Sequence, residues 1–596
     1  SPLHISPHKN TRIYFCANRV FRSEDRGDSW APVSGDLSRQ IDRDTLPVFG
    51  KLQPPEAVFK HGSTSFYGNI TAFAESPKKE GLLVAGTDDG LIQVTTDGGK
   101  NWAKADKFPG VPDMTFVARV VPSQHDSDTL YVAFDNHKNA DFAPYLLKSA
   151  DAGKTWTSIV GDLPARGSVL AFAEDHVNPK LLFCGTEFAL YFTVDGGGKW
   201  HRLKSGLPTI AVKDLAIQRA MNDLVVATFG RGFYVLDDYS PLREASSETF
   251  EKQATIFPIR DAFQYPTRDQ YGGRAKASRG ETFYTADNPA YGATIAYHLK
   301  EALPTKKQKR REAAKGPNPK YPNLADQRAE AEEEEPAVLL TISDAEGTPV
   351  RILTGPTAAG VHRVTWDLRI PGASFTAPVS RRQEVDEDAP AFVASGPQVV
   401  PGKYRVTLSK RVEGNVTELA RPVDLTVKYV GPQPLPAEEA TALAEFQKQA
   451  IRLQRDLNAA TGLAGELTGR LDQIKVALDQ TPEAPAGARE KVRRLIARHR
   501  ETVRTLSGDV FLQGRWENAP TSVRERVSAA ADATRQLVDR PTGTQREQFK
   551  IARELIDRES ASLRRTVETD VKELEQLLDK LGAPWTPGRL PPAKPK

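Results

Sequence analysis

The chain has 596 residues, with 81 Lys or Arg and 77 Asp or Glu, so its formal net charge is only +4 at pH 7. This length corresponds to about three to five domains, and the balanced charge gives no argument for nucleic-acid binding. Two cysteines, Cys16 and Cys184, exclude a disulfide framework and are typical of buried thiols. The sequence contains neither an apolar run long enough to span a bilayer nor the pattern of a signal peptide.

An eight-residue phrase, called the box below, occurs four times before residue 201. It reads Ser or Thr, any residue, Asp, any residue, Gly, any two residues, Trp. Its Asp and Ser or Thr can bond nearby backbone amides, Gly allows positive φ, and Trp supplies a large apolar side chain, so the box predicts a tight hairpin turn. The box residues are Ser23, Asp25, Gly27, Trp30; Thr95, Asp97, Gly99, Trp102; Ser149, Asp151, Gly153, Trp156; and Thr193, Asp195, Gly197, Trp200.

The boxes recur at the spacing of a repeat fold. Successive box tryptophans are 72, 54 and 44 residues apart, and the shortest step is close to one four-stranded propeller blade of about 40 to 50 residues. An apolar strand, a turn and a second apolar strand precede the boxes, as in 82–94 and 181–192. We therefore expect residues 1–240 to hold four to five blades of a β-propeller.

The boxes are similar to the Asp-boxes, or bacterial neuraminidase repeats, and the segment 225–238 resembles the last blade of bacterial sortilin-like propeller proteins. These are secreted proteins, often labelled glycosyl hydrolases, so the resemblance, which covers about residues 1–430, implies an extracytoplasmic bacterial protein in the periplasm, at the cell surface or secreted. Function does not follow, because Asp-box propellers include sialidases, xyloglucanases, photosystem assembly factors and sorting receptors.

Residues 4–15 match the repeat from the end of a first strand onward. We therefore expect the chain to be the C-terminal part of a longer precursor. A propeller ring leaves sheet edges unpaired unless its first and last blades meet. Either a second polypeptide completes the ring, or a small ring closes unusually, and the first alternative is favoured.

Beyond the propeller the pattern changes twice. Short alternating strands separated by turns over 241–430 predict an immunoglobulin-like β-sandwich packed beside the propeller. Its charged insertion, 303–336, is either a docking loop for a charged partner or, as we favour, a solvated hairpin extension. A second interruption, 371–400, is expected to be a long loop.

A spacing of three and four residues then predicts an antiparallel helical bundle over 436–582, followed by a proline-rich tail, 583–596. We expect a first helix of about 45 residues, a second over 487–506, a third from after Asn518 to about 539, and a fourth that starts at a capping box, Thr544 to Glu547. The bundle is either a stalk or a surface that binds a partner. The overall prediction is a multidomain, mainly β protein: a partial Asp-box propeller, an immunoglobulin-like sandwich and an antiparallel α-helical bundle.

Candidate functional residues are few. Asp88 and Glu187 are catalytic candidates, because glycoside hydrolysis needs two carboxylates about 5 to 10 Å apart. They occupy the same place in the repeat, which favours turn formation. Arg231, between Gly230 and Gly232, is a weak binding candidate that we expect to reach into the propeller channel. No spacing predicts metal ligands, and no cofactor is expected.

Two functions follow from this pattern. The first is an extracytoplasmic binding or assembly scaffold that binds protein or glycan, with the N-terminal part of the same precursor as one protein partner. The alternative is a sialidase-like or xyloglucanase-like glycoside hydrolase whose site lies partly in missing N-terminal blades. We expect no nucleic-acid partner and no transmembrane segment.

Overall fold

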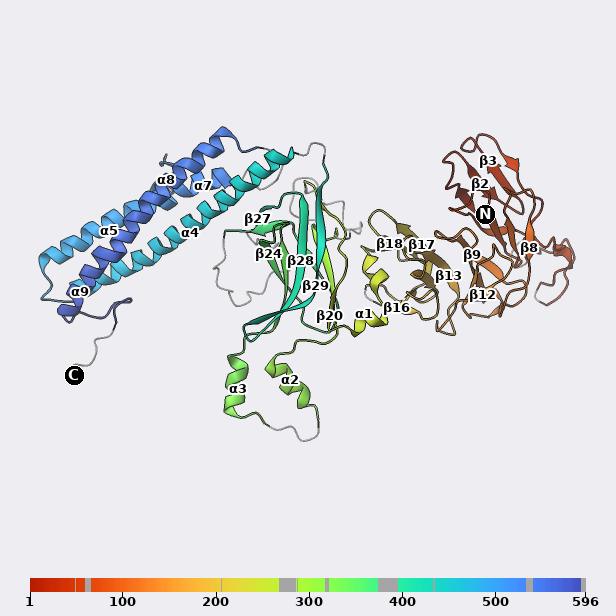
Figure 1. Cartoon of the computed structure of the whole chain (residues 1–596), viewed down its shortest axis with the longest axis horizontal. Coiled ribbons are helices and arrows are strands. Elements are labelled where there is room, and N and C mark those ends of the chain that lie inside the picture. Colours follow the sequence, from red (N-terminus) through yellow and green to blue (C-terminus); the bar gives the residue numbers. More distant parts are fainter. Residues whose placement is uncertain are drawn as a thin grey trace. The chain divides into compact units, whose positions relative to one another are not determined.

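The computed structural model describes residues 1–596 except 49, 59, 61–65, 205, 267–285, 287, 317–320, 374–394, 432–434, 532–539 and 591–596. The protein is mainly β, with many antiparallel sheets and a C-terminal helical region (Figure 1). The chain divides into two compact units, Ser1–Gln253 and Ala254–Lys596.

Within its described residues, the first unit contains five consecutive antiparallel sheets, and in each the strand order follows the chain. The first sheet comprises β1 (Leu3–Ile5), β2 (Ile13–Cys16), β3 (Val20–Ser23) and β4 (Ala31–Pro32); the second comprises β5 (Ile70–Glu75), β6 (Leu83–Thr87), β7 (Ile92–Thr95) and β8 (Ala103–Ala105). The third comprises β9 (Phe116–Pro122), β10 (Leu130–Asp135), β11 (Tyr145–Ser149) and β12 (Thr157–Ser158). The fourth comprises β13 (Val169–Glu174), β14 (Leu182–Thr186), β15 (Leu190–Thr193) and β16 (His201–Leu203), and the fifth comprises β17 (Val212–Gln218), β18 (Asp223–Thr228) and β19 (Phe233–Leu236). Short helices η1 (Arg43–Thr45), η2 (His137–Asn139), η3 (Ser240–Glu244) and α1 (Ser247–Glu251) lie in the connections.

Four of these sheets share the same irregularity in the pairing of their first and second strands. The first strands β5, β9, β13 and β17 all shift register against the second strand of their sheet near the start of the first strand. This common irregularity allows equivalent positions to be compared. Leu83, Leu182 and Leu224, for example, pair with the ends of their first strands at Glu75, Glu174 and Ile217.

Each internal sheet is apolar on both faces and packs on two neighbours. We call the face that contacts the preceding sheet the leading face and the opposite one the trailing face. The leading-face residues Phe73, Leu83 and Ala85 of the second sheet share a buried cluster with Tyr14 and Cys16 of the first. Equivalent leading-face residues of the later sheets also lie in clusters with the sheet before them: Val120, Leu130 and Val132; Phe172, Leu182 and Cys184; Leu215, Leu224 and Val226.

The second unit begins with three sheets. A three-stranded sheet has the order β20 (Ala254–Ile256), β22 (Ala293–Leu299), β25 (Gly360–Trp366), and a two-stranded sheet pairs β26 (Arg369–Pro371) with β27 (Ser395–Gln398). A five-stranded sheet has the order β21 (Ala262–Gln264), β29 (Asn415–Tyr429), β28 (Gly402–Val412), β23 (Ala337–Ser343), β24 (Pro349–Gly355). Strands of the three- and five-stranded sheets share one buried cluster, in which Trp366 lies against Tyr404 with ring centroids 5.4 Å apart.

The charged insertion forms a helical hairpin of α2 (Lys306–Ala313) and α3 (Leu324–Ala331). Arg310 and Glu330 join the two helices at 2.6 Å, so the basic and acidic blocks partly neutralise each other. The predicted loop 371–400 lies largely outside the described residues, and β26 and β27 border it.

The helical region comprises α4 (Ala437–Asp479), α5 (Ala486–Ser507), α6 (Val510–Gln513), α7 (Val523–Ala531), α8 (Gly543–Arg565), the π-helix Thr566–Val571 and α9 (Lys572–Lys580). Helix α4 coincides with the predicted seam. The predicted capping box at Thr544 is wrong: Thr542 caps α8, since its hydroxyl accepts from the Gln545 amide while the Gln545 side chain accepts from the Thr542 amide. Two overlapping Thr-x-x-Gln and Thr-x-x-Glu patterns compete here, and the chain uses the earlier one.

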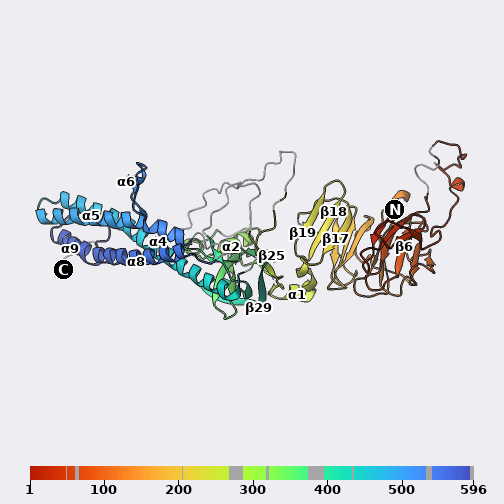
Figure 2. The same cartoon turned by 90° about the horizontal axis from the view of Figure 1, so that it is seen from above.

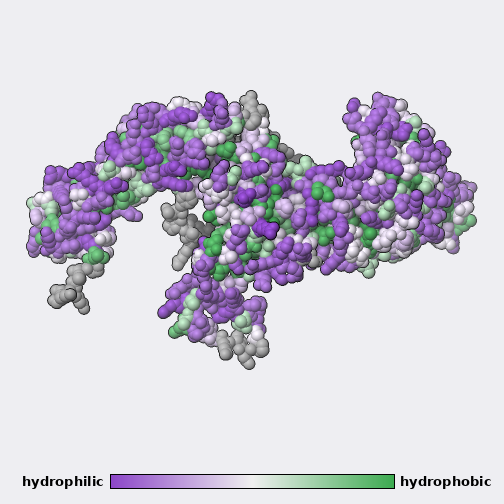
Figure 3. Space-filling view, viewed as in Figure 1, coloured by the Kyte–Doolittle hydropathy of each residue, from purple (hydrophilic) through white to green (hydrophobic). Residues whose placement is uncertain are grey.

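The third helix also starts later than predicted. It begins at Val523, where Ser522 and Glu525 cap its first turn, rather than with Pro520 in its first turn. Residues 532–539 and the last six residues of the predicted tail lie outside the described part of the chain. On the face shown in Figure 3, hydrophilic residues predominate and hydrophobic ones form small patches.

His499 makes the helical region sensitive to pH. It is 4% exposed, its Nε2 lies 3.0 Å from the Ala464 carbonyl, and its Nδ1 has no hydrogen-bond partner among the described residues. Burial lowers its pKa below the ordinary 6.5. Protons therefore bind the unfolded state first, and stability present above pH 6.5 is lost as the pH falls below that value.

We expect the urea midpoint of the helical signal at 222 nm to fall between pH 7.5 and pH 5, and to fall less in His499→Gln. His201→Gln, at an exposed histidine, is the matched control and should keep the wild-type pH dependence. If the urea midpoint of His499→Gln falls with pH as much as that of the wild type, this role of His499 is contradicted.

Candidate functional site

A cavity of the first unit lies where the first strands of its five sheets converge. It measures about 410 Å³. Because every sheet contributes its first strand, the cavity wall is built from five separate segments of the chain. The lining residues are His4, Ile5, Pro7; Phe73, Ala74, Glu75, Pro77; Arg119, Val120, Val121, Pro122, Gln124; Phe172, Ala173, Glu174, His176; and Asp214, Leu215, Ile217, Arg219.

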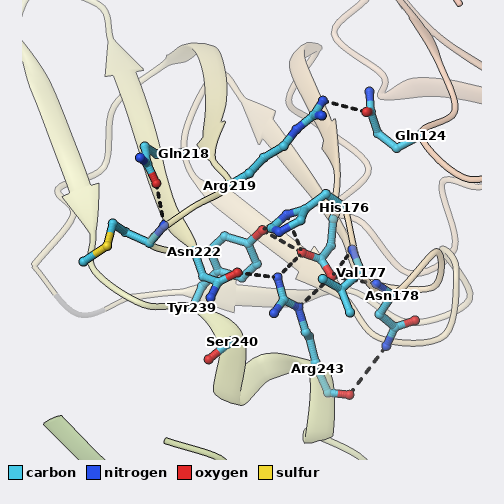
Figure 4. A network of polar contacts seen from close by, with 12 residues as sticks. Gln124, His176, Val177, Asn178, Gln218, Arg219, Asn222, Tyr239, Ser240 and Arg243 are labelled. Atoms are coloured by element: carbon cyan, nitrogen blue, oxygen red, sulfur yellow. Dashed lines mark hydrogen bonds and ion pairs between the residues drawn. The ribbon is translucent and has the colours of Figure 1, made fainter. Parts of the chain in front are cut away.

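Two arginines connect the third and fifth sheets at this wall. Arg119 donates to the Asp214 carboxylate at 2.8 Å and to the Lys213 carbonyl at 3.1 Å. Arg219 donates to the Gln124 side-chain oxygen at 2.6 Å (Figure 4). The cavity wall therefore carries two arginines and three carboxylates, Glu75, Glu174 and Asp214, together with apolar side chains.

The two glutamates of the wall, Glu75 and Glu174, occupy equivalent strand ends. Glu174 accepts from the Ser123 hydroxyl at 2.8 Å and from the Tyr131 hydroxyl at 3.0 Å. Burial and the Glu174 charge raise the pKa of Tyr131, which keeps this phenol protonated. Glu75 accepts from the Gly81 amide at 3.0 Å. Glu174 therefore joins the fourth sheet to the third, whereas Glu75 accepts from an amide of its own sheet's hairpin.

An ion pair lies beside the cavity, around Asp175. Its carboxylate is fully buried. It accepts two hydrogen bonds from the Arg243 guanidinium, both at 2.8 Å, and one from the Tyr239 hydroxyl at 2.6 Å. Figure 4 shows Arg243, Tyr239 and His176 converging on this point, and Arg243 also donates to Asn222 at 2.8 Å. Although burial opposes the charge, these donors lower the pKa of Asp175. The network fixes the segment after β19 onto the fourth sheet.

The catalytic candidates Asp88 and Glu187 do not reach the cavity. Asp88 accepts from the backbone amides of Tyr67 at 2.6 Å and Asn69 at 2.8 Å. Glu187 faces the amide of Ser168 at 3.4 Å. In both sheets the carboxylate meets the amide 19 residues earlier, at the start of the first strand. The cavity lies toward the other end of these strands, so the two carboxylates act as equivalent turn braces.

Arg231 lies exposed in the turn between β18 and β19, and it is not among the described residues that line the cavity. The reason is topological, because the cavity is lined by first strands, whereas this turn joins the second and third strands. The Thr228 hydroxyl and amide both donate to Gly232 O, at 2.8 and 3.1 Å, and close the turn.

The boxes form one hydrogen-bonded turn each. In the first, the Ser23 hydroxyl donates to Asp25 at 2.7 Å and accepts from the Gly27 amide at 2.8 Å, while Asp25 accepts from Ser29 N at 2.9 Å. The bonds from Ser29 and Ser23 lower the pKa of Asp25 to about 2. Thr95, Ser149 and Thr193 repeat the hydroxyl-to-Asp bond at 2.6 to 2.8 Å.

The box glycines have φ between +87° and +108°, a region that L side chains avoid. The tryptophans differ: the indole of Trp30 bonds within its own box to Gly27 O at 2.9 Å, while the indole of Trp200 bonds to Ile159 O, beyond its box, at 3.1 Å. The box aspartates are thus engaged by their own turns.

Sequence reasoning missed the cavity residues Arg119, Asp214 and Arg219. Arg119 and Asp214 lie on first strands and Arg219 directly follows β17, so their only sequence signal was a charged residue on or just after a first strand. Within the described residues, no group of three or more His, Cys, Asp or Glu side chains is placed to hold a metal ion, and no helix is long and apolar enough to cross a bilayer.

No protein-family model and no curated protein matches the chain. Part of it is similar to the GH74 xyloglucanase from Xanthomonas campestris, with 14% identity and a TM-score of 0.31 over 70% of this chain and 64% of that one. An ancestral GH74 enzyme gives 16% identity and a TM-score of 0.29 over 38% and 27%, and YCF48 bound to D1 peptide gives 13% and 0.26 over 39% and 65%. This chain thus spans 27% of the ancestral enzyme and 65% of that YCF48.

We expect Arg243→Ala to destabilise the first unit by about 3 kcal/mol or more, because it leaves the buried Asp175 charge without its cation. Urea unfolding followed by tryptophan fluorescence measures this, since four of the seven tryptophans lie in the boxes. The loss should shrink as the pH falls below about 3.8, the ordinary pKa of the carboxyl, where Asp175 gains protons in the unfolded state.

Arg231→Ala, which removes an exposed arginine, is the control and should unfold as the wild type does. An Arg243→Ala variant as stable as this control would show that the network contributes nothing.

Proposed function

We propose that the chain is an extracytoplasmic binding or assembly scaffold. In this proposal the five sheets are blades of a partial, Asp-box β-propeller of the sortilin-like kind. The sheets of the second unit then form an immunoglobulin-like sandwich, and the helices form an antiparallel bundle. The observation that carries the proposal is that the two outermost sheets expose apolar residues at repeat positions that are buried elsewhere.

The first sheet exposes its leading face. Leu3 is 68% and Phe15 is 43% exposed, whereas Phe73 and Ala85 at the equivalent positions of the second sheet are 8% and 0% exposed. The strand pairings place Leu3 opposite Phe15, and Phe73 opposite Ala85, which establishes the equivalence.

The fifth sheet exposes its trailing face. Phe233 is 78% and Val235 is 53% exposed, but Ile92 and Val94, which hold the same positions in the second sheet, are 0% and 6% exposed. The two sheets therefore present opposite faces of the same repeat. Burying a large apolar side chain contributes about 1.5 to 3 kcal/mol, so covering both faces is strongly favourable.

We infer that a second polypeptide carrying further sheets of this repeat covers both faces, and the N-terminal part of a common precursor fits this description. At each internal boundary, the partner of a leading face is the trailing face of another two-sided apolar sheet. The cavity wall would then be extended by the first strands of the added sheets. Its mixture of charged and apolar side chains suits a protein or glycan ligand.

Among the described residues, the carboxylates considered as candidates are already engaged by other groups. Asp88 and Glu187 are engaged by backbone amides, Glu75 accepts from the Gly81 amide, and Glu174 accepts from Ser123 of the third sheet. Asp214 is paired with Arg119. A hydrolytic site would therefore require carboxylates from the second polypeptide.

A photo-crosslinking amino acid at Phe233 or Phe15, introduced in the native host, tests the covering of the two faces. We expect each position to capture a polypeptide whose cross-linked peptide contains the same repeat of strand, turn, strand and box. The matched position Tyr321, which is 89% exposed on the charged hairpin, should not capture this polypeptide.

Three results would contradict the proposal. These are a cross-link between Phe233 and Phe15 of one chain, a cross-link to a second copy of the chain, and no cross-link at either position in the native host.

A further inference from the structure

Within the described residues, the fifth sheet of the first unit has three strands, whereas each of the four sheets before it has four. Its last strand, β19, lies at one margin of the sheet, beside β18 (Figure 2). In the other sheets the equivalent third strands, β3, β7, β11 and β15, each pair with a fourth strand. No strand in the described part of the chain pairs with the outer edge of β19. The fifth sheet therefore stops one strand short of the repeat.

The outer edge of β19 presents backbone groups that are bonded in the equivalent strands. In the first and third sheets, the carbonyls of Val20 and Leu146 accept from the amides that directly follow the fourth strands. These amides belong to Val33 and Ile159, at 2.8 and 3.0 Å. Phe233 holds the position of Val20 and Leu146, because each of the three pairs with the fourth residue of its second strand. The peptide group of Phe233 therefore faces the open edge.

The same reasoning extends along the strand. Backbone groups of successive residues point alternately to the two edges of an antiparallel strand. Since Phe233 faces the open edge, Val235 faces it as well, whereas Tyr234 and Leu236 face β18. The open edge thus offers two N–H donors and two C=O acceptors to an added strand.

Strand β19 also lacks the residues that protect natural sheet edges. Its sequence is Phe-Tyr-Val-Leu, without a charge or a proline. The strands that form the outer edges of the other four sheets are only two or three residues long. They carry Pro32, Lys104, the polar pair Thr157 and Ser158, or Arg202. Short length, charge and proline all oppose unwanted pairing, so β19 is typical of a strand that has a neighbour on both sides.

The order of the strands indicates which polypeptide supplies the missing one. In each of the first four sheets, the fourth strand precedes the first strand of the next sheet in the chain. That next sheet packs on the trailing face of the sheet before it. By the same order, a polypeptide whose first sheet covers the trailing face of the fifth sheet would carry the missing strand just before that sheet. Phe233 and Val235 combine both features, since their side chains lie on the exposed trailing face and their peptide groups on the open edge.

We propose that an extended segment of the second polypeptide pairs with β19 as the fourth strand of the fifth sheet, and that this segment precedes the first sheet of that polypeptide. The inference rests on the function proposed above and specifies how the partner is held. Backbone hydrogen bonds along one edge of the fifth sheet add to the apolar contacts across its trailing face.

Hydrogen exchange at single-residue resolution tests this pairing in the isolated chain and in the assembly from the native host. In the isolated chain, the amides of Phe233 and Val235 should exchange rapidly. Those of Tyr234 and Leu236, which face β18, should be protected and serve as references. In the assembly, the amides of Phe233 and Val235 should exchange at least about tenfold more slowly, because each gains a hydrogen-bond acceptor.

The variants Val235→Pro and Val235→Ala separate the edge from the face. Both remove the valine side chain from the trailing face, but only proline removes the outward N–H. Because this N–H does not face β18, both isolated variants should keep a urea midpoint close to that of the wild type. The amount of repeat-bearing polypeptide that co-purifies from the native host should be at least about tenfold lower for Val235→Pro than for Val235→Ala. If Val235→Pro fails to fold, the exchange rates of the wild type decide.

Four results would overturn the proposal, and they separate it from the function on which it rests. Rapid exchange at Phe233 and Val235 in an assembly that covers the Phe233 side chain would leave the scaffold function standing without the added strand. Protection of both amides in the isolated chain would show that the chain covers its own edge. Equal recovery of the polypeptide with folded Val235→Pro and Val235→Ala would show that the edge is not used. A native assembly without a repeat-bearing polypeptide would contradict the proposed function and this inference together.

Discussion

Packing of two-sided apolar sheets against one another is the interaction on which the first unit depends. Within the described residues of this unit, every sheet carries apolar side chains on both faces, including the two outermost sheets. Glycines mark the tightest contacts. A Cβ at Gly86 or Gly185 would lie 2.3 to 2.5 Å from a Val methyl of the next sheet. The sheets therefore depend on their neighbours for stability. Covering an exposed outer face with a further sheet would bury its apolar side chains.

This dependence also explains why the polar groups of the first unit are poor candidates for catalysis. Hairpins that must hold large apolar sheets in register use their carboxylates on backbone amides. Asp25 in the boxes, Asp88 in the turns and Glu174 at the strand ends are all engaged in this way. Side chains of the cavity wall, such as Arg119, Arg219 and Glu174, bond to partners on other sheets.

Much of this could be read from the sequence, because its local signals are strong. The boxes, the alternating strands and the long seam of α4 each depend on residues close together in the chain. The exceptions have identifiable causes. Overlapping capping patterns misplaced the start of α8 by two residues, since Thr542 and Thr544 offer the same chemistry. The cavity could not be located, because it joins residues such as Arg119 and Asp214, 95 positions apart, through the arrangement of successive sheets. Arg231 lies in the turn between the second and third strands of its sheet, apart from the first strands that line the cavity.

The central claim is that the exposed leading and trailing faces are covered in the native assembly. Hydroxyl-radical footprinting of the protein isolated from its host measures this directly, with Tyr321 and Leu324, 89% and 83% exposed, as internal references. The account predicts that Leu3, Phe15 and Phe233 will be as protected as Phe73, while the reference residues react freely. If these three side chains instead react as freely as the references in the native assembly, the faces are open to solvent and the account is contradicted.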